Sequence, residues 1–254
     1  MIIKMDYEVS NYNNNSSARE QYGINWREQQ LEVSRAFPVL MQKVYLWMSL
    51  ALVITGFTAY FVATSQTLLT MIFGNSLVMW GLIIAEFALV FAISGAINKL
   101  SLTTATLLFT LYSVLNGATL SVIFLAYTLS SIASVFFITS ATFGAMALYG
   151  YFTKKDLSSW GRILFMALIG IIIATVVNIF LKSGALNMIV SYVGVLVFVG
   201  LTAYDSQKIK EMLLQASDAG EGMQKIALLG ALSLYLDFIN LFIYLLRIFG
   251  SNRD

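Results

Sequence analysis

The stretch "SLYLDFINLFIYLLRIFG", residues 233 to 250, decides the class of fold, because it is apolar enough and nearly long enough to cross a bilayer by itself. It nevertheless carries a carboxylic acid, Asp237, close to its first third. An ionised carboxylate at the centre of a membrane helix costs about 3 kcal/mol. Asp237 therefore needs water, a proton or a partner, and the remaining sequence indicates which of these it has.

The composition of the whole chain is that of a membrane protein. Of its 254 residues 59% are hydrophobic and only 11% are charged, and the mean hydropathy is +0.80. The chain has no Cys and no His, which excludes disulfides, thiolate or imidazole metal sites and nucleophiles that depend on a histidine base. A net charge of +2 is too small and too dispersed for a nucleic-acid-binding surface. We expect no cofactor and no enzymatic activity.

Seven apolar segments follow Pro38, each of about the ~20 residues that cross the hydrocarbon core. Lipid offers the backbone no hydrogen bonds, and the segments show no alternation of polar and apolar residues, so they are predicted to be helices. The expected fold is an all-α membrane protein, a seven-transmembrane-helix bundle over residues 39–254. The spans are predicted near residues 42–63, 76–97, 102–126, 132–152, 160–181, 187–210 and 226–249.

Residues 1–38 differ from the rest and are expected to form a polar cytoplasmic tail. The run "SNYNNNSS", residues 10–17, is of low complexity and is expected to be disordered. Residues 19–37 alternatively form a short amphipathic helix on the membrane surface. Pro38 is expected to end whatever precedes the first span. No signal peptide is expected, because the first apolar run begins near residue 40.

The basic residues predict the orientation of the bundle. Twelve of the fifteen lie in the tail or at the ends that follow spans two, four and six, and three lie on the other side. The positive-inside rule therefore places the N-terminus in the cytoplasm and, with seven spans, the C-terminus outside. The short loops favour a bacterial inner membrane. The twelve are Lys4, Arg19, Arg27, Arg35, Lys43, Lys99, Lys154, Lys155, Arg162, Lys208, Lys210 and Lys225, and the three are Lys182, Arg247 and Arg253.

A second aspartate is predicted to lie at the depth of Asp237. Asp205 belongs to "LTAYDSQKIK", residues 201–210 in the sixth span, and the midpoint between the two aspartates is residue 221. Residue 221 lies in the turn-like "SDAGEGMQ", residues 217–224. An antiparallel helix pair that reverses there brings Asp205 and Asp237 to the same level of the membrane.

The seventh span also carries a polar stripe. Ser233, Asp237, Asn240, Tyr244 and Arg247 are spaced four, three, four and three apart, which places them on one face of a helix. Such a face lines a pore or an ion site, or it only bonds to neighbouring helices. The second interpretation is favoured for Ser233, Asn240 and Tyr244. A functional role is favoured for the aspartates, because membrane carboxylates usually mark ion or proton pathways.

A third acid, Glu86, lies at the middle of the second span, in "GLIIAEFALVF". Two roles are equally compatible with this position. Glu86 lines an ion pathway, or it makes a structural hydrogen bond to a neighbour such as Asn116 or Asn178. No basic residue lies as deep in the spans, so the core of the bundle is predicted to be acidic.

Two carboxylates at one depth have a specific chemistry. Like charges a few ångströms apart resist simultaneous ionisation, so the pair is expected to share a proton and to respond to pH near neutrality. Carboxylate oxygens also suit hard cations such as Ca²⁺, although a complete protein cage needs about six to eight oxygens. The expected binding of Ca²⁺ by Asp205 and Asp237 is therefore weak and transient, which suits permeation better than storage.

These motifs resemble a known family. "SLYLDFINLFIYLLRIFG", the upstream "AYDSQKIK" (203–210), the mid-span Glu86 and "YFTKKDLSSWGR" (151–162) are similar to the transmembrane Bax-inhibitor-motif family, in its bacterial, YccA-like branch. The resemblance covers roughly residues 40–250. It implies a seven-helix bundle with the last helix central, and a pH-sensitive leak of cations, chiefly Ca²⁺, controlled by a pair of aspartates that corresponds to Asp205 and Asp237.

The resemblance also bears on gating and partners. A cation that latches an aspartate from the loop after span two would have to be Lys99, and lysine lacks the planar two-pronged geometry of arginine. Eukaryotic members are associated with protection from cell death, and bacterial relatives with restraint of a membrane-bound protease.

Two other classes of function remain open. A regulator without transport activity would bind and restrain another membrane protein, such as a protease, with its polar tail as the handle. Paired aspartates on adjacent spans, one in a Tyr-Asp dipeptide, also occur in intramembrane aspartyl proteases. The second aspartate of those enzymes follows Gly-x-Gly, whereas Asp237 follows "LYL", and the single proline at 38 leaves no Pro-Ala-Leu motif. The protease is therefore the less favoured alternative.

Overall fold

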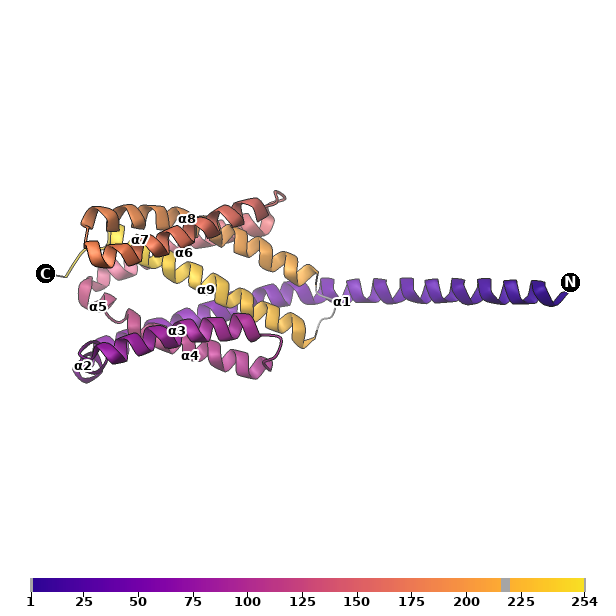
Figure 1. The fold of residues 1–254 in the computed structure, drawn as a ribbon, viewed down its shortest axis with the longest axis horizontal. Coiled ribbons are helices and arrows are strands. Elements are labelled where there is room, and N and C mark those ends of the chain that lie inside the picture. The colour runs from indigo at the N-terminus through magenta and orange to yellow at the C-terminus, as the bar shows by residue number, and fades with distance from the viewer. Residues whose placement is uncertain (1, 216–219, 254) are drawn as a thin grey trace.

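The computed structural model describes residues 2–215 and 220–253. The regular elements in these two ranges are all helices (Figure 1). The predicted reversal over residues 217–224 lies partly outside the described residues. In chain order the helices are α1 (Ile2–Ala63), α2 (Gln66–Phe73), α3 (Ser76–Ala96), α4 (Leu102–Leu120), α5 (Ile123–Ala126), α6 (Leu129–Phe152), α7 (Ser158–Leu181), α8 (Gly184–Leu214) and α9 (Glu221–Phe249).

The prediction of seven transmembrane helices is confirmed. Within the described part of the chain, seven helical segments are long and apolar enough to cross a membrane. They agree with the predicted spans, apart from ends that differ by a few residues. The larger difference is in the first span, which begins well before the predicted residue 42. The segments are Val33–Ala63, Ser76–Ala96, Leu102–Ala126, Leu129–Phe152, Ser158–Leu181, Gly184–Leu214 and Glu221–Phe249.

Side-chain caps explain where several of these helices begin. Ser101 accepts a hydrogen bond from the backbone N–H of Thr104, Thr128 from Ser131, and Ser183 from Leu186. Each of these residues has an extended backbone and satisfies one of the free N–H groups of the first helical turn. These three helices therefore start at short polar residues that the sequence places directly before their apolar runs.

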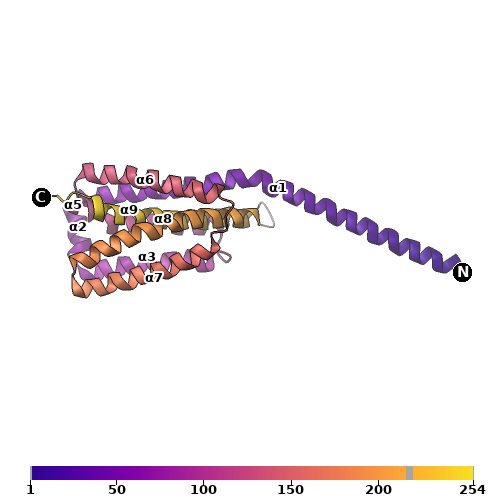
Figure 2. The same ribbon diagram turned by 90° about the horizontal axis from the view of Figure 1, so that it is seen from above.

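The last helix is central, as predicted. In Figure 1 α9 runs between one group formed by α1, α3 and α4 and another formed by α6, α7 and α8, and in Figure 2 it again lies in the middle of the bundle. In its most apolar window 67% of the residues of α9 are buried, compared with 6% for α3 and for α7. The peripheral helices thus present their apolar side chains to lipid, whereas α9 is enclosed by protein.

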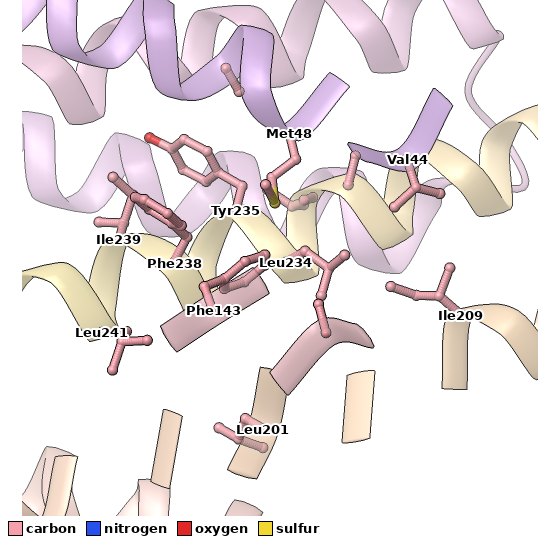
Figure 3. Close-up of a cluster of buried hydrophobic side chains, with 14 of the residues drawn as sticks. Val44, Met48, Phe143, Leu201, Ile209, Leu234, Tyr235, Phe238, Ile239 and Leu241 are labelled. Carbon is pink, nitrogen blue, oxygen red and sulfur yellow. The ribbon is translucent and has the colours of Figure 1, made fainter. Parts of the chain in front are cut away.

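The core is built around the middle of α9. Tyr235 and Leu234 are fully buried there, and the rings of Phe238 and Phe143 of α6 meet edge to face with centroids 5.4 Å apart. Figure 3 shows these side chains together with Met48 of α1. Aromatic edge-to-face contacts of this kind stabilise the packing beyond the burial of apolar area. Asp237 lies between Tyr235 and Phe238 in the sequence, so it is flanked by side chains that are packed in the core.

The N-terminal region differs from the expectation. α1 continues through Pro38, so the prediction that Pro38 ends the preceding segment is wrong. A proline inside a helix leaves one carbonyl without its usual partner, and a helix can continue past it with a bend. The residues before Pro38 were expected to be disordered or to lie on the membrane surface, but they form the first part of α1. This part of α1 projects away from the bundle, and the helix changes direction close to the bundle (Figure 2). The division into a tail and a bundle at residue 38 stays a prediction.

Candidate functional site

Asp237 of α9 is buried in the middle of the bundle. Its side chain is 4% exposed, and its Oδ2 atom has no hydrogen-bond partner among the described residues. Asp205 of α8 is half-buried and close enough for the two carboxylates to repel each other when ionised. Lys208, one turn further along α8, acts on Asp205 in the opposite sense, as an attracting charge. The two predicted acids therefore lie within electrostatic range of each other on the packed helices α8 and α9, with the cation Lys208 beside Asp205.

Two glycines, one from each helix, allow α8 and α9 to approach closely on either side of this pair. A Cβ atom on Gly230 would lie 2.9 Å from Cγ1 of Ile209. A Cβ atom on Gly194 would lie 2.7 Å from the ring of Tyr244. Small residues at such crossings bring helix backbones together. Close packing above and below the aspartates holds their two backbones at a set separation.

The helix that carries Asp205 is fixed to its other neighbours at the next residue. The hydroxyl of Ser206 donates to the carbonyl of Ala147 on α6, at 2.8 Å. The hydroxyl of Tyr45 on α1 lies 3.2 Å from the same Ser206 oxygen. Because Ser206 is buried, these bonds form without competition from solvent. α8 is therefore anchored to α6 and α1 directly beside Asp205.

The other polar residues of the α9 stripe make contacts within the protein. The side-chain amide of Asn240 donates to the carbonyl of Leu236 in its own helix, at 2.8 Å. The ring of Tyr244 stacks on Phe198 with centroids 5.8 Å apart, and the guanidinium of Arg247 lies 5.4 Å from its centroid. Ser233 is half-buried. These contacts favour packing roles for Asn240 and Tyr244. An ion-binding role for Ser233, Asn240 and Tyr244 stays a prediction.

Glu86 makes the structural hydrogen bonds that were one of its two predicted roles. Its carboxylate accepts from the hydroxyl of Thr119 at 2.7 Å and from the side-chain amide of Asn116 at 3.3 Å. The other predicted partner, Asn178, instead accepts from the backbone N–H of Ser183. In the described residues no three acidic side chains gather into a metal-binding set. Glu86 therefore belongs to a cluster separate from the two aspartates.

This cluster includes three side chains that sequence reasoning missed, those of Thr119, Tyr235 and Thr55. The hydroxyl of Tyr235 donates to Oδ1 of Asn116 at 3.1 Å and lies 2.7 Å from Oγ1 of Thr55, which donates to the carbonyl of Ser113 at 2.9 Å. A tyrosine within an apolar run looks like a packing residue. Its position two residues from Asp237 was the only available signal.

Lys99 is exposed in the segment between α3 and α4. Among the described residues the ion pair is formed elsewhere, between Lys225 and Glu221 at 3.1 Å. Glu221 also accepts from the backbone N–H of Leu102 at 3.0 Å, so this carboxylate joins the start of α4 to the start of α9. The structure does not join Lys99 to Asp205 or Asp237, and its role as a latch stays a prediction.

The two other motifs of the sequence, "AYDSQKIK" and "YFTKKDLSSWGR", contact each other. Oε1 of Gln207 accepts from the backbone N–H of Leu157 and its Nε2 donates to the carbonyl of Lys155, both at 2.8 Å. Nζ of Lys210 donates to the carbonyl of Tyr151 at 2.7 Å. α8 thus holds the loop between α6 and α7 in place from the turn that follows Asp205.

Comparison with known proteins identifies one family. The family model described as Inhibitor of apoptosis-promoting Bax1 matches residues 38–254. The inner membrane protein YbhL of Escherichia coli K12 is 54% identical over 214 residues, which are 84% of this chain and 92% of that protein. An uncharacterised protein of Borreliella burgdorferi is 47% identical over 84% of this chain and 92% of its own length. One of Rickettsia prowazekii is 44% identical over 84% and 90%. The resemblance seen in the sequence is confirmed, and the chain belongs to the Bax inhibitor family of integral membrane proteins.

Proposed function

We propose that this protein is a pH-sensitive cation leak channel of the inner membrane, with Ca²⁺ as the permeant ion and Asp205 and Asp237 as the proton sensor. The observation that carries the proposal is the Oδ2 atom of Asp237, which is buried and has no hydrogen-bond partner within the described residues. Buried polar atoms kept for stability are almost always satisfied. An unsatisfied carboxylate oxygen in mid-membrane is available to a proton or to a passing cation.

The pairing of the acids supports a response to pH. When both are ionised their charges repel, so a proton held between them relieves the repulsion and is released as the pH rises. Within residues 2–215 and 220–253 no third acid joins the two carboxylates, and two carboxylates alone bind a hard cation only weakly. Weak binding lets the ion leave as readily as it enters, which permeation requires.

We also propose that the N-terminus is cytoplasmic and the C-terminus external. Twelve of the fifteen basic residues lie on the N-terminal side. The two chain ends lie at opposite ends of the bundle (Figure 1), in keeping with an odd number of spans.

The test is Ca²⁺ efflux from liposomes that contain the pure protein, measured over a range of pH. Wild type should leak with a pH-dependent rate, and Asp205→Asn together with Asp237→Asn should flatten that dependence. These substitutions keep size and hydrogen bonding but remove titration. Asp156→Asn, which removes an exposed acid from the loop between α6 and α7, is the matched control and should leave the profile unchanged. A folded double variant with the wild-type profile would place the sensor elsewhere.

A second candidate function is a regulator that binds and restrains another membrane protein, such as a membrane-bound protease. One observation favours it. α1 extends beyond the bundle on its N-terminal side (Figure 1), and the family model begins only at residue 38. Deletion of residues 1–36 separates the two functions, because a leak should survive the deletion and a tail-mediated interaction should not. Absence of flux in wild type at every pH would favour the regulator.

A further inference from the structure

α9 carries two buried polar side chains close together in sequence. Asp237 lies within reach of the charge of Asp205 on α8, whereas Tyr235, two residues earlier, contacts residues of α1 and α4. Successive residues of a helix are about 100° apart around its axis, so these two point to nearly opposite sides. Any rotation of α9 that moves one of them must also move the other.

Tyr235 is held by its hydroxyl and by its ring. It is fully buried, and its hydroxyl bonds to Thr55 of α1 at 2.7 Å and to Asn116 of α4 at 3.1 Å. Its ring meets the rings of Phe109 and Tyr112 edge to face, with centroids 5.8 and 5.7 Å apart. The ring contacts tolerate small rotations of the helix, but hydrogen bonds weaken steeply with distance and angle. The hydroxyl is therefore the part of Tyr235 whose contacts respond most sharply to a rotation of α9.

Asn116 extends this contact to the third membrane acid. Its amide oxygen accepts from Tyr235 while its amide nitrogen donates to Glu86 of α3. The orientation of the Asn116 amide is thus fixed by partners on both sides. A change in the charge of Glu86 alters the strength of the hydrogen bond that the amide nitrogen donates to it. Because the amide group is rigid, a reorientation of its nitrogen also moves its oxygen, which accepts from the hydroxyl of Tyr235.

We propose that Tyr235 is a positioning residue for the aspartate pair, and that its hydroxyl couples Glu86 to Asp237 by fixing the rotation of α9. This inference rests on the proposed function of Asp205 and Asp237. Glu86 then acts on the pair at a distance, through Asn116 and α9, and does not line the same site.

The titratable and charged groups around α9 are few. α8 contributes Asp205 and, beside it, Lys208. α4 contributes Tyr112, and α1 contributes Tyr45, whose hydroxyl lies beside Ser206. α6 presents Phe136 and Phe143, which do not titrate. Glu86 is reached through Asn116 of α4.

The experiment compares Tyr235→Phe with Tyr112→Phe in full-length protein. Both remove one buried or nearly buried hydroxyl and keep the ring, but only the hydroxyl of Tyr235 bonds to Thr55 and Asn116. One readout is the pH midpoint of Ca²⁺ leak from liposomes. The other is the infrared carbonyl band of protonated Asp237, assigned by its loss in Asp237→Asn, which is followed with pH in nanodiscs and does not require transport.

Tyr235→Phe should move the midpoint of both readouts to lower pH by ~0.5 unit or more, because a freer α9 lets the two carboxylates separate and ionise more easily. Tyr112→Phe should move neither. Glu86→Gln should shift the midpoint in the wild-type background and have no further effect in Tyr235→Phe, as coupling through that hydroxyl requires. Thr55→Val, which removes one partner of the hydroxyl, provides the same comparison if Tyr235→Phe does not fold.

Several results would overturn the inference. An infrared titration of Asp237 that is the same in Tyr235→Phe, Tyr112→Phe and wild type would show that the hydroxyl does not position the pair. An effect of Glu86→Gln that persists in Tyr235→Phe would show that the coupling runs elsewhere. Lack of any leak in wild type would contradict the proposed channel, while the infrared band would still report whether Tyr235 positions Asp237.

Discussion

Gly150 of α6 lies against the backbone carbonyl of Ala203 on α8, and a Cβ atom at Gly150 would overlap that carbonyl. Ala203 is two residues from Asp205, so this contact sets how closely α6 approaches the part of α8 that carries the acid. A neighbouring backbone cannot move aside as the end of a flexible side chain can. The close approach therefore requires glycine at position 150.

Gly150→Ala should lower the free energy of unfolding by ~1–3 kcal/mol, because an added methyl group must push two packed helices apart. Thermal unfolding in detergent measures the change. Gly144→Ala is the matched control, since a Cβ atom there has nothing within 4 Å and the residue lies in the same helix. Its higher helix propensity should make it neutral or slightly stabilising. Equal melting temperatures for the two variants would contradict the contact.

Gln207→Ala should loosen the loop between α6 and α7. It removes the acceptor of the Leu157 N–H and the donor to the carbonyl of Lys155, and an unpaired buried group costs ~1–3 kcal/mol. Hydrogen exchange of residues 153–157 should become faster. Gln207→Glu keeps the acceptor for the Leu157 N–H but places an oxygen against the carbonyl of Lys155, so exchange should also be faster than in wild type. Unchanged exchange in Gln207→Ala would show that the loop is held by other contacts.

The sequence predicted most of the fold because the membrane leaves few choices for an apolar chain. Length and hydropathy located seven spans, and the reversal near residue 221 placed Asp205 and Asp237 on facing helices. The role of Tyr235 could not be read in the same way. Its hydrogen bonds to Thr55 and Asn116 join helices that are far apart in the chain. The spacing of residues along one helix shows which of them share a face, but it does not show which other helix that face contacts. Pro38 was misread because a proline can be accommodated within a long helix.

A reporter fused after Asp254 should behave as external, and one fused before Met1 as cytoplasmic. The reason is the concentration of twelve of the fifteen basic residues on the N-terminal side. A pair of fusions to a phosphatase, active outside, and to a fluorescent protein, active inside, measures this in cells. Both ends on one side of the membrane would contradict seven complete spans.

Lys208→Gln should move the pH midpoint of leak upward by a few tenths of a unit, whereas Lys99→Gln should leave it unchanged. Lys208 attracts the ionised form of Asp205, so its loss makes ionisation of the pair harder and shifts it to higher pH. The shift is small because Lys208 is exposed and its charge is screened. Lys99 is exposed and not joined to either aspartate in this structure. A shift in Lys99→Gln equal to that in Lys208→Gln would indicate a latch formed in another state.

Asp237→Asn should be at least as stable as wild type at pH 8. A buried ionised carboxylate with one unsatisfied oxygen is costly to the folded state, and an amide of the same shape removes that charge. Residues kept for function often lower stability in this way. Thermal unfolding in one detergent measures the difference, and Tyr235→Phe, which loses two hydrogen bonds, should be less stable than wild type under the same conditions. If Asp237→Asn instead lowers the melting temperature as much as Tyr235→Phe, Asp237 is a packing residue, and the pH sensor must be sought at Glu86.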